Sequence, residues 1–304
     1  GDAGEVQGAY ATRDADPRNP MLNRTIAERY APGSTFKVLT AIALIENGIA
    51  NPDTRMDSPV STTLPGTNTE VSNIESSTCG DGNPTLTEAF ARSCNTTFVL
   101  ASEKLTTQQL TDVTKRFGFG HEQEIPLTVI PSVFPSDADS AQLAMSSIGQ
   151  YTVQATPMQM AQVAQTIANG GQMMSPYLIK QIVDADNQTI RKTKATEAGR
   201  PISADTASKV TGMMQAVVSQ PYGSGTPMAI PNVSVAAKTG TAETGEGDRA
   251  NAWAMGFAPA DNPQIAFAVI VEGDDNVPAP HGGDVAGPVA RAVLEAGLQC
   301  VSRA

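Results

Sequence analysis

A serine and a lysine three residues apart constrain this chain more than any other feature of its sequence. Ser34 and Lys37 follow Pro32-Gly33, which stops the preceding segment, and an apolar run with helical spacing extends from Val38 until Asn47-Gly48. The pattern predicts a helix that begins near Ser34. Residues i and i+3 share a helix face, so we expect the Lys37 amine to reach the Ser34 hydroxyl. The positive end of the helix dipole would favour negative charge on that oxygen.

A nucleophile beside a base is the minimum that covalent catalysis requires. The motif alone is also compatible with an N-cap serine followed by a solvated lysine. The interpretation of Ser34 and Lys37 therefore depends on what else the sequence contains.

Composition excludes several classes of function. The chain has 304 residues, 40% of them hydrophobic, which is enough for a substantial core in one large domain or two smaller ones. Its formal charge is −11 and its pI is about 4.6, so no nucleic-acid partner is expected, because phosphate binding requires basic patches. No apolar run reaches the roughly 18–20 residues that span a bilayer.

Two histidines are present, His121 and His281, and we expect both in surface loops. A Ser-His-Asp hydrolase would have to use one of them, but the chain has no Gly-x-Ser-x-Gly elbow. His121-Glu122 lacks the second histidine of a zinc protease, since Ile125 stands in its place. The dipeptide Gly-Lys is absent, which excludes a P-loop. We therefore expect no metal and no cofactor, and chemistry that depends on Ser, Lys, Asn, Thr and carboxylates.

Apolar periodicity and capping patterns predict an α+β fold, in which an antiparallel sheet is flanked by helices on both faces. Three β-rich runs at 233–242, 252–258 and 265–271 are the expected strands, and 177–183 should form a hairpin with 189–194. Residues 51–83 are expected to be mostly irregular. Helices are expected at 85–91 (with Thr85 and Glu88 as a capping box), 96–105, 107–117, 157–169, 203–218 and 288–298, the last with Pro288 in its first turn.

Two further short motifs accompany the first. Ser93-Cys94-Asn95 lies in a connection between two expected helices, and Lys238-Thr239-Gly240-Thr241 lies on the first of the late strands. Ser-x-x-Lys, Ser-Asp-Asn and Lys-Thr-Gly together are typical of penicillin-binding proteins and class A β-lactamases. Here Ser93 and Asn95 keep the outer residues of the second motif. Each motif is weak by itself, but the ordered set is a specific signal.

The chain resembles the transpeptidase domain of class B penicillin-binding proteins, in particular the actinobacterial penicillin-binding protein A type. The resemblance extends from about residue 20 to residue 297. It implies the penicillin-recognising serine enzyme fold, which β-lactamases share. The further segments that carry it are Asn23-Arg24-Thr25, Tyr30-Ala31, Ile148-Gly149-Gln150, Ala155-Thr156-Pro157-Met158-Gln159-Met160-Ala161, Ala168-Asn169-Gly170-Gly171, Ala252-Trp253 and Gly256-Phe257-Ala258-Pro259.

This resemblance implies a serine D,D-transpeptidase that cross-links peptidoglycan stem peptides ending in D-Ala-D-Ala and is acylated by β-lactams. Ser34 would be the nucleophile. Lys37 would take its proton, which requires a pKa lowered by burial and by the charge of Lys238. Ser93 would relay the proton to the departing D-alanine, and Asn95 would hold both the Lys37 side chain and the substrate amide.

The Lys-Thr-Gly strand would bind the other end of the substrate. Lys238 would stabilise negative charge, and the hydroxyls of Thr239 and Thr241, on either side of Gly240, would bind the terminal carboxylate. The backbone N–H groups of Ser34 and Thr241 would form the oxyanion hole.

The family's organisation sets further expectations. Residues 1–304 should form one transpeptidase domain that lacks its first strands, with the pedestal domain and membrane anchor upstream of this chain. The expected location is the extracytoplasmic face of the bacterial cell membrane. A glycosyltransferase is the expected protein partner.

Other functions remain open at this level. A D,D-carboxypeptidase differs only in its use of water as acceptor. Class A β-lactamases need a glutamate for deacylation, and the loop at 119–140 offers Glu122 and Glu124 without a Glu-x-x-x-Asn pattern. Class D-like β-lactamases and β-lactam sensors carry Ser-x-Val where this chain has Asn95. A scaffold without catalytic activity is the non-enzymatic alternative.

Cysteine spacing predicts one disulfide. Peptidoglycan is made outside the cytoplasm, where disulfides persist. Cys79 and Cys94 are separated by the loop-forming Gly80-Asp81-Gly82-Asn83-Pro84, so the chain can fold back and pair them. The bond would fix the turn that carries Ser93 and Asn95. Cys300 is left without a partner in this chain.

Overall fold

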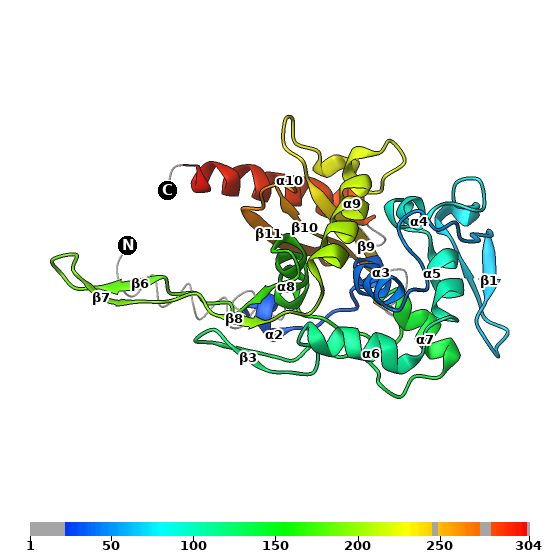
Figure 1. Ribbon diagram of the computed structural model, residues 1–304, viewed down its shortest axis with the longest axis horizontal. Coiled ribbons are helices and arrows are strands. Elements are labelled where there is room, and N and C mark those ends of the chain that lie inside the picture. Colours follow the sequence, from blue (N-terminus) through cyan, green and yellow to red (C-terminus); the bar gives the residue numbers. More distant parts are fainter. Residues whose placement is uncertain (1–21, 245–248, 274–280, 303–304) are drawn as a thin grey trace.

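An antiparallel sheet, with three strands in the part of the chain that the structure describes, lies at the centre of the fold (Figure 1). The computed structural model describes residues 22–244, 249–273 and 281–302. The strands, in the spatial order β11-β10-β9, are β9 (Ala236–Glu243), β10 (Ala250–Ala258) and β11 (Ile265–Val271). The prediction of three late antiparallel strands is confirmed, with small shifts at their ends.

The central strand β10 supplies core side chains to both faces of the sheet, because successive residues of a strand point in opposite directions. Trp253 and Phe257 belong to the larger hydrophobic core, whereas Ala252 and Ala254 belong to a second core on the other face. Every residue of β10 is buried. The predicted arrangement, with helices on both faces of an antiparallel sheet, is therefore confirmed.

The helices divide between the two faces. α8 packs on β11 and α9 on β9, while α10 crosses β10 and β11 (Figure 1). Among the described residues, no helix is both long and apolar enough to cross a bilayer. The helices are α2 (Arg24–Ala27), α3 (Lys37–Glu46), α4 (Leu86–Arg92), α5 (Asn95–Ser102), α6 (Thr107–Arg116), α7 (Ser140–Ser147), α8 (Pro157–Ala168), α9 (Ala204–Ser219) and α10 (Gly282–Val301), with 3-10 turns η1 (Gly33–Phe36), η2 (Ile74–Ser76) and η3 (Thr226–Met228).

Two predictions about helix ends were wrong. The last helix begins at Gly282, so Pro288 lies inside it. Ala286 and Ala290, on the inner face of this helix, are fully buried, and this burial outweighs the one hydrogen bond that proline cannot donate. Thr85 caps α4 as expected, but the Glu88 side chain pairs with Arg92 at 2.8 Å instead of completing a capping box.

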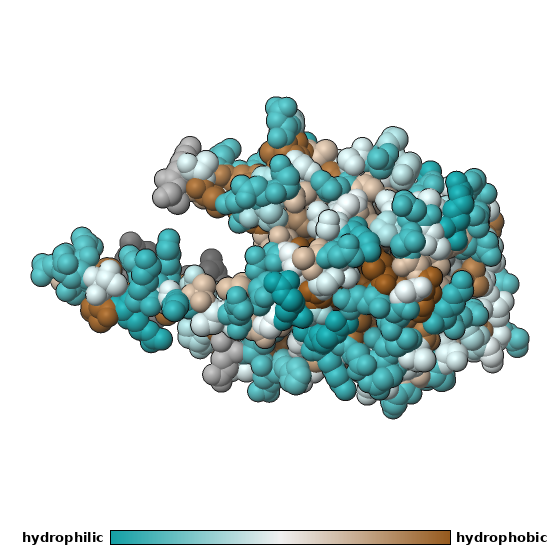
Figure 2. Space-filling model, in the orientation of Figure 1, coloured by the Kyte–Doolittle hydropathy of each residue, from teal (hydrophilic) through white to brown (hydrophobic). Residues whose placement is uncertain are grey.

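Four pairs of short strands form separate two-stranded sheets among the described residues. The hairpin of β6 and β7 was predicted from the sequence and stands clear of the body in Figure 2. The pairs are β1 (Ser61–Thr63) with β2 (Glu70–Ser72), β3 (Gln123–Glu124) with β4 (Thr128–Val129), β5 (Met173–Met174) with β8 (Glu197–Gly199), and β6 (Gln181–Val183) with β7 (Thr189–Lys192).

Close backbone approaches fix η1 against the sheet. Gly33 N donates a hydrogen bond to Gly149 O at 3.0 Å, and a Cβ on Gly149 would lie 2.0 Å from Gly33 O. On the other side, a Cβ on Gly240 would lie 3.0 Å from both Pro32 O and Thr35 N. Trp253 adds a hydrogen bond from Nε1 to Ala31 O at 3.0 Å. Glycine is needed here because the backbones touch.

A comparison of two glycines tests this packing. Gly149 and Gly48 both have positive φ, +77° and +67°, but only Gly149 has atoms within 4 Å of an added Cβ. Gly48→Ala should lower the free energy of unfolding by about 1–2 kcal/mol through backbone strain. Gly149→Ala should lower it by about 3–5 kcal/mol, because overpacking adds to the strain. Urea unfolding measures both, and equal losses would contradict the proposed role of close packing.

Candidate active site

Ser34 lies on a 3-10 turn rather than on the α-helix that the sequence predicted. η1 covers Gly33–Phe36, and α3 begins only at Lys37. Gly33 has φ +52°, a value that other residues rarely adopt, so the chain turns sharply just before the serine. Side chains three residues apart eclipse one another in a 3-10 turn. This geometry places Lys37 Nζ 3.0 Å from Ser34 Oγ.

The Lys37 amine is held by two carbonyl oxygens. Nζ donates to Ser93 O and to Asn95 Oδ1, both at 2.7 Å. Asn95 Nδ2 donates to Ser72 O at 3.0 Å, which orients the amide with its oxygen toward Lys37. Carbonyl oxygens can only accept hydrogen bonds. A neutral amine therefore donates its two hydrogens to these oxygens, and its lone pair can accept the proton of Ser34. Lys37 is therefore arranged to accept the Ser34 proton.

Burial makes the neutral form of Lys37 accessible. The residue is fully buried, and its Nζ lies 5.6 Å from the centroid of the Phe98 ring. Desolvation lowers the pKa of Lys37 well below its usual range, and the nearby charge of Lys238 lowers that pKa further.

Ser93 joins the two lysines. Its Oγ accepts a hydrogen bond from Lys238 Nζ at 2.9 Å and lies 3.5 Å from Lys37 Nζ. The residue ends α4 in the left-handed conformation, with φ +64°. Such a backbone is strained for a residue other than glycine and is found most often at functional sites. The turn sends the Ser93 carbonyl and hydroxyl toward the same buried amine.

Lys238 is the second buried amine. Its Nζ donates to Ser93 Oγ and to Thr239 O, each at 2.9 Å, and lies 5.6 Å from the centroid of the Phe90 ring. Desolvation lowers the pKa of Lys238 to about 7. Since the pKa of Lys37 is lowered by both burial and charge, we assign the positive charge to Lys238 whenever the pair carries only one.

The two threonines of the Lys-Thr-Gly strand have partners that the sequence analysis missed. Thr239 Oγ1 and Ser224 Oγ are 2.6 Å apart, and Gly282 N donates to Thr241 Oγ1 at 3.2 Å. Because Thr241 Oγ1 already accepts the Gly282 N–H, its own hydrogen is free to donate to a ligand. The sequence Gly223-Ser224-Gly225 was the only signal for this loop, and such loops are common.

These groups open into one cleft of about 470 Å³. Ser34, Ser93, Asn95, Thr239, Gly240 and Thr241 all line it, so the structure brings together every accessible site residue named from the sequence. The two lysines lie buried beneath them. His281, predicted in a surface loop, is exposed before α10 and also lines the cleft. Among the described residues, no cluster of three or more His, Cys, Asp or Glu could hold a metal.

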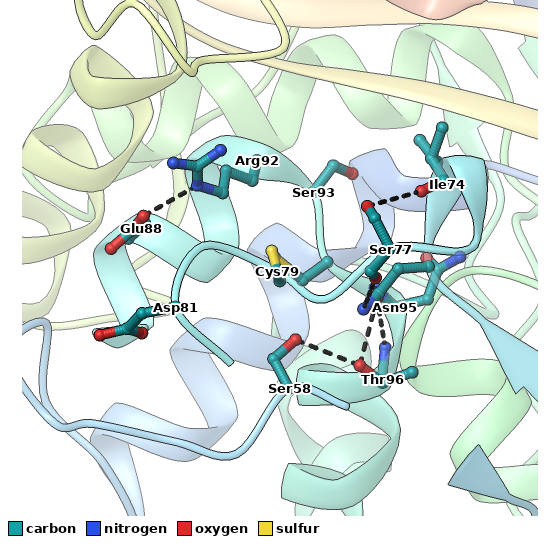
Figure 3. Close-up of a disulfide and its surroundings, with 12 residues drawn as sticks. Ser58, Ile74, Ser77, Cys79, Asp81, Glu88, Arg92, Ser93, Asn95 and Thr96 are labelled. Carbon is teal, nitrogen blue, oxygen red and sulfur yellow. Dashed lines mark hydrogen bonds and ion pairs between the residues drawn. A yellow bond between two sulfur atoms is a disulfide. The ribbon is translucent and has the colours of Figure 1, made fainter. Parts of the chain in front are cut away.

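A disulfide lies next to the segment that carries Ser93 and Asn95 (Figure 3). It joins Cys79 to Cys94, whose Cα atoms are 6.0 Å apart. Asn73, a residue that the sequence analysis missed, accepts hydrogen bonds from Asn95 N at 2.8 Å and Thr96 N at 3.0 Å. The loop before α4 is thus fixed to the start of α5 at two points. Cys300 is free and exposed on α10.

Comparisons with known proteins agree with this geometry. The family model described as penicillin binding protein transpeptidase domain matches residues 2–295. The peptidoglycan D,D-transpeptidase PbpA of Mycolicibacterium smegmatis is 43% identical over 93% of this chain and 58% of its own length. The PbpA of Mycobacterium tuberculosis is 40% identical over 97% of this chain and 60% of its own length. The chain thus spans about three-fifths of these curated relatives.

Solved structures of penicillin-binding protein A have a similar fold. Penicillin-binding protein A of M. tuberculosis, as a ceftriaxone acyl-enzyme complex, superposes with a TM-score of 0.89 at 38% identity, covering 98% of this chain and 67% of that one. Its penicillin G acyl-enzyme complex gives 0.88 at 37% identity, with 98% and 68% covered. Because the family model extends over nearly the whole sequence and the mycobacterial relatives share its fold, this chain belongs to the family of penicillin-binding protein transpeptidase domains.

Proposed function

We propose that this chain is the catalytic domain of a serine D,D-transpeptidase that cross-links peptidoglycan stem peptides. The observation that carries the proposal is the position of Lys37 Nζ, 3.0 Å from Ser34 Oγ and 2.7 Å from two carbonyl oxygens. This arrangement supports a neutral base beside a nucleophile. The names of the mycobacterial relatives support the reaction class.

The first half-reaction forms an acyl-enzyme. Neutral Lys37 takes the proton from Ser34, and Oγ attacks the carbonyl carbon between the two terminal D-alanines. The C–N bond then breaks as Ser93 gives its proton to the departing amine and takes up the proton held by Lys37, because its hydroxyl lies beside both lysines. Free D-alanine leaves, and the ester on Ser34 remains.

The second half-reaction transfers the acyl group. The amine of an acceptor stem peptide attacks the ester carbonyl, gives up a proton through the same side chains, and releases Ser34. In both halves the backbone N–H groups of Ser34 and Thr241 would stabilise the negative oxygen. Such a donor contributes about 3–4 kcal/mol in studied hydrolases. Lys238 would add its positive charge.

The hydroxyls of Thr239 and Thr241 would bind the terminal carboxylate, with Gly240 between them. A hydroxyl pair with Ser224 and the Gly282 N–H support these two side chains. Ser224 and Gly282 act here as positioning residues, because each orients a hydroxyl rather than reaching the scissile bond.

β-Lactams would acylate the same serine. The ceftriaxone and penicillin G complexes of penicillin-binding protein A of M. tuberculosis are acyl-enzymes of this kind. Asn95 disfavours the class D-like alternative, since its Oδ1 accepts from Lys37 and a valine could not. A D,D-carboxypeptidase would use the same groups with water as acceptor.

The setting of the reaction follows from its substrate. Peptidoglycan cross-linking takes place outside the cytoplasm, so we place this domain at the extracytoplasmic face of the cell membrane, held by an upstream anchor. The larger size of the relatives supports one transpeptidase domain within a longer protein. A glycosyltransferase partner would supply the glycan strands to be cross-linked.

Removal of the nucleophile tests the proposal. Ser34→Ala should abolish the mass increase produced by benzylpenicillin and leave the thermal midpoint within about 2 °C, because it deletes one partly exposed hydroxyl. Ser136→Ala, at an exposed serine outside the cleft, is the matched control and should label fully. Intact-mass spectrometry with peptide mapping provides the readout. An adduct that persists on another residue would contradict the assignment of Ser34 as the nucleophile.

Replacement of the base tests its protonation state. Lys37→Arg keeps a long cationic side chain but removes a group that can be neutral near pH 7. We expect the second-order acylation rate to fall at least about 100-fold, the lower range of general base catalysis. Lys209→Arg, at a half-buried, salt-bridged lysine of α9, should change the rate less than about twofold. A mild effect of Lys37→Arg would mean that another group takes the proton.

The disulfide should contribute mainly to stability. Its half-cystines are 15 residues apart, and closure of such a loop stabilises a protein by about 3 kcal/mol in the chain-entropy model. Cys79→Ser combined with Cys94→Ser should lower the free energy of unfolding by about that amount. Cys300→Ser, at the exposed free thiol, should have no measurable effect. Unchanged stability of the double variant in denaturant titrations would contradict this role.

A further inference from the structure

We infer that Ile74 is a specificity-determining residue, an apolar wall of the cleft that binds the apolar part of a group attached to the amide beside Asn95. In a β-lactam this group is the acyl side chain. In a stem peptide it is the aliphatic stem of the residue before D-Ala-D-Ala. The inference rests on the proposed function and identifies a residue that would help to select its substrates.

Ile74 is exposed inside the cleft that the catalytic side chains line. Its relative exposure is 50%, yet it lines the same cleft as Ser34, Ser93 and Asn95. A single exposed isoleucine needs no explanation on a convex surface. In a cleft, a few apolar side chains among oriented polar groups are what ligands of mixed character require.

The loop that carries Ile74 is tied to the catalytic residues. The preceding Asn73 is buried and accepts hydrogen bonds from Asn95 N and Thr96 N. Asn73 Nδ2 in turn donates to Pro59 O at 2.9 Å and to Ser77 O at 3.2 Å. These bonds set the position of Ile74 relative to the start of α5.

The other end of the loop is fixed as well. Ser77 Oγ donates to Ile74 O at 3.3 Å, and the chain then reaches the disulfide of Cys79 with Cys94. Figure 3 shows the Ile74 side chain pointing away from the disulfide. An apolar surface that is already ordered loses little conformational entropy when a ligand covers it.

The chemistry of Asn95 indicates which part of a ligand Ile74 meets. Asn95 Oδ1 accepts from Lys37, and one hydrogen of Nδ2 goes to Ser72 O. An amide NH₂ has two hydrogens, so Nδ2 retains one for a ligand carbonyl. The substituent on that carbonyl would extend beyond Asn95, along the wall where Ile74 stands.

Two penicillins that differ by one ring test the inference. Benzylpenicillin carries a phenylacetyl group, and N-acetyl-6-aminopenicillanic acid keeps the amide but lacks the phenyl ring. In the full-length protein, Ile74→Ala should lower the second-order acylation rate of Ser34 by benzylpenicillin about fivefold to tenfold, because apolar contact area is lost. The rate with the acetyl compound should change less than about twofold.

Two further variants complete the experiment. Ile74→Leu keeps the apolar volume and should retain most of the preference for benzylpenicillin. Ile190→Ala, at an isoleucine of β7 that is 67% exposed, should leave both rates unchanged. An unchanged rate with the acetyl compound also shows that the Ile74 variant is folded.

The outcomes separate this inference from the proposed function. Equal losses with both penicillins, or no loss with either, would overturn the role of Ile74 while Ser34 acylation stands. Failure of both compounds to label Ser34 in the unaltered protein would overturn the proposed function and the inference with it.

Discussion

Two buried amines share one serine hydroxyl, and the rest of the site depends on that contact. Ser93 Oγ lies 2.9 Å from Lys238 Nζ and 3.5 Å from Lys37 Nζ, and both lysines are fully buried. Two positive charges so close together in a dry interior repel strongly, so one amine gives up its proton. The buried pair lowers the stability of the folded state, because burial lowers the pKa of Lys238 to about 7. Between that pH and the usual pKa of lysine the unfolded chain binds more protons than the folded one. The free energy of unfolding therefore rises with pH across this window. A neutral base in the site therefore comes with a less stable folded state.

Three segments far apart in the sequence meet at the amines, and glycines allow them to approach. Gly33 contacts Gly149, and Gly240 contacts the turn that carries Ser34, at distances that leave no space for a side chain. The strained turn at Ser93 and the disulfide beside it bring the second motif to the same point. Local strain and close packing thus serve one purpose, the placement of Lys37 between a nucleophile and two carbonyl acceptors.

The motifs and most of the helices and strands could be predicted from the sequence, because helical periodicity, capping residues and the late β-rich runs are local signals. The predicted start of α10 was wrong. Proline favours the first turn of a helix, but here the helix begins at Gly282, because burial of its earlier residues extends it before Pro288. The 3-10 turn under Ser34 was also missed, because its i and i+3 residues share a face in either kind of helix. Four partners of the site left no periodic pattern in the sequence. Asn73 and Ser224 lie in loops, Ile74 begins the short turn η2, and Gly282 is the first residue of α10.

The pH dependence of acylation tests the assignment of charge most directly. The second-order rate constant for benzylpenicillin reports the ionisation of the free enzyme. With Lys37 as neutral base and Lys238 as the charged partner, the rate should rise as Lys37 loses its proton, at a pH well below the usual pKa of lysine. It should fall again as Lys238, whose pKa is lowered to about 7, loses its own. A rate that keeps rising up to the usual pKa of lysine, about 10.4, would show that the base is charged at neutral pH and would contradict the account.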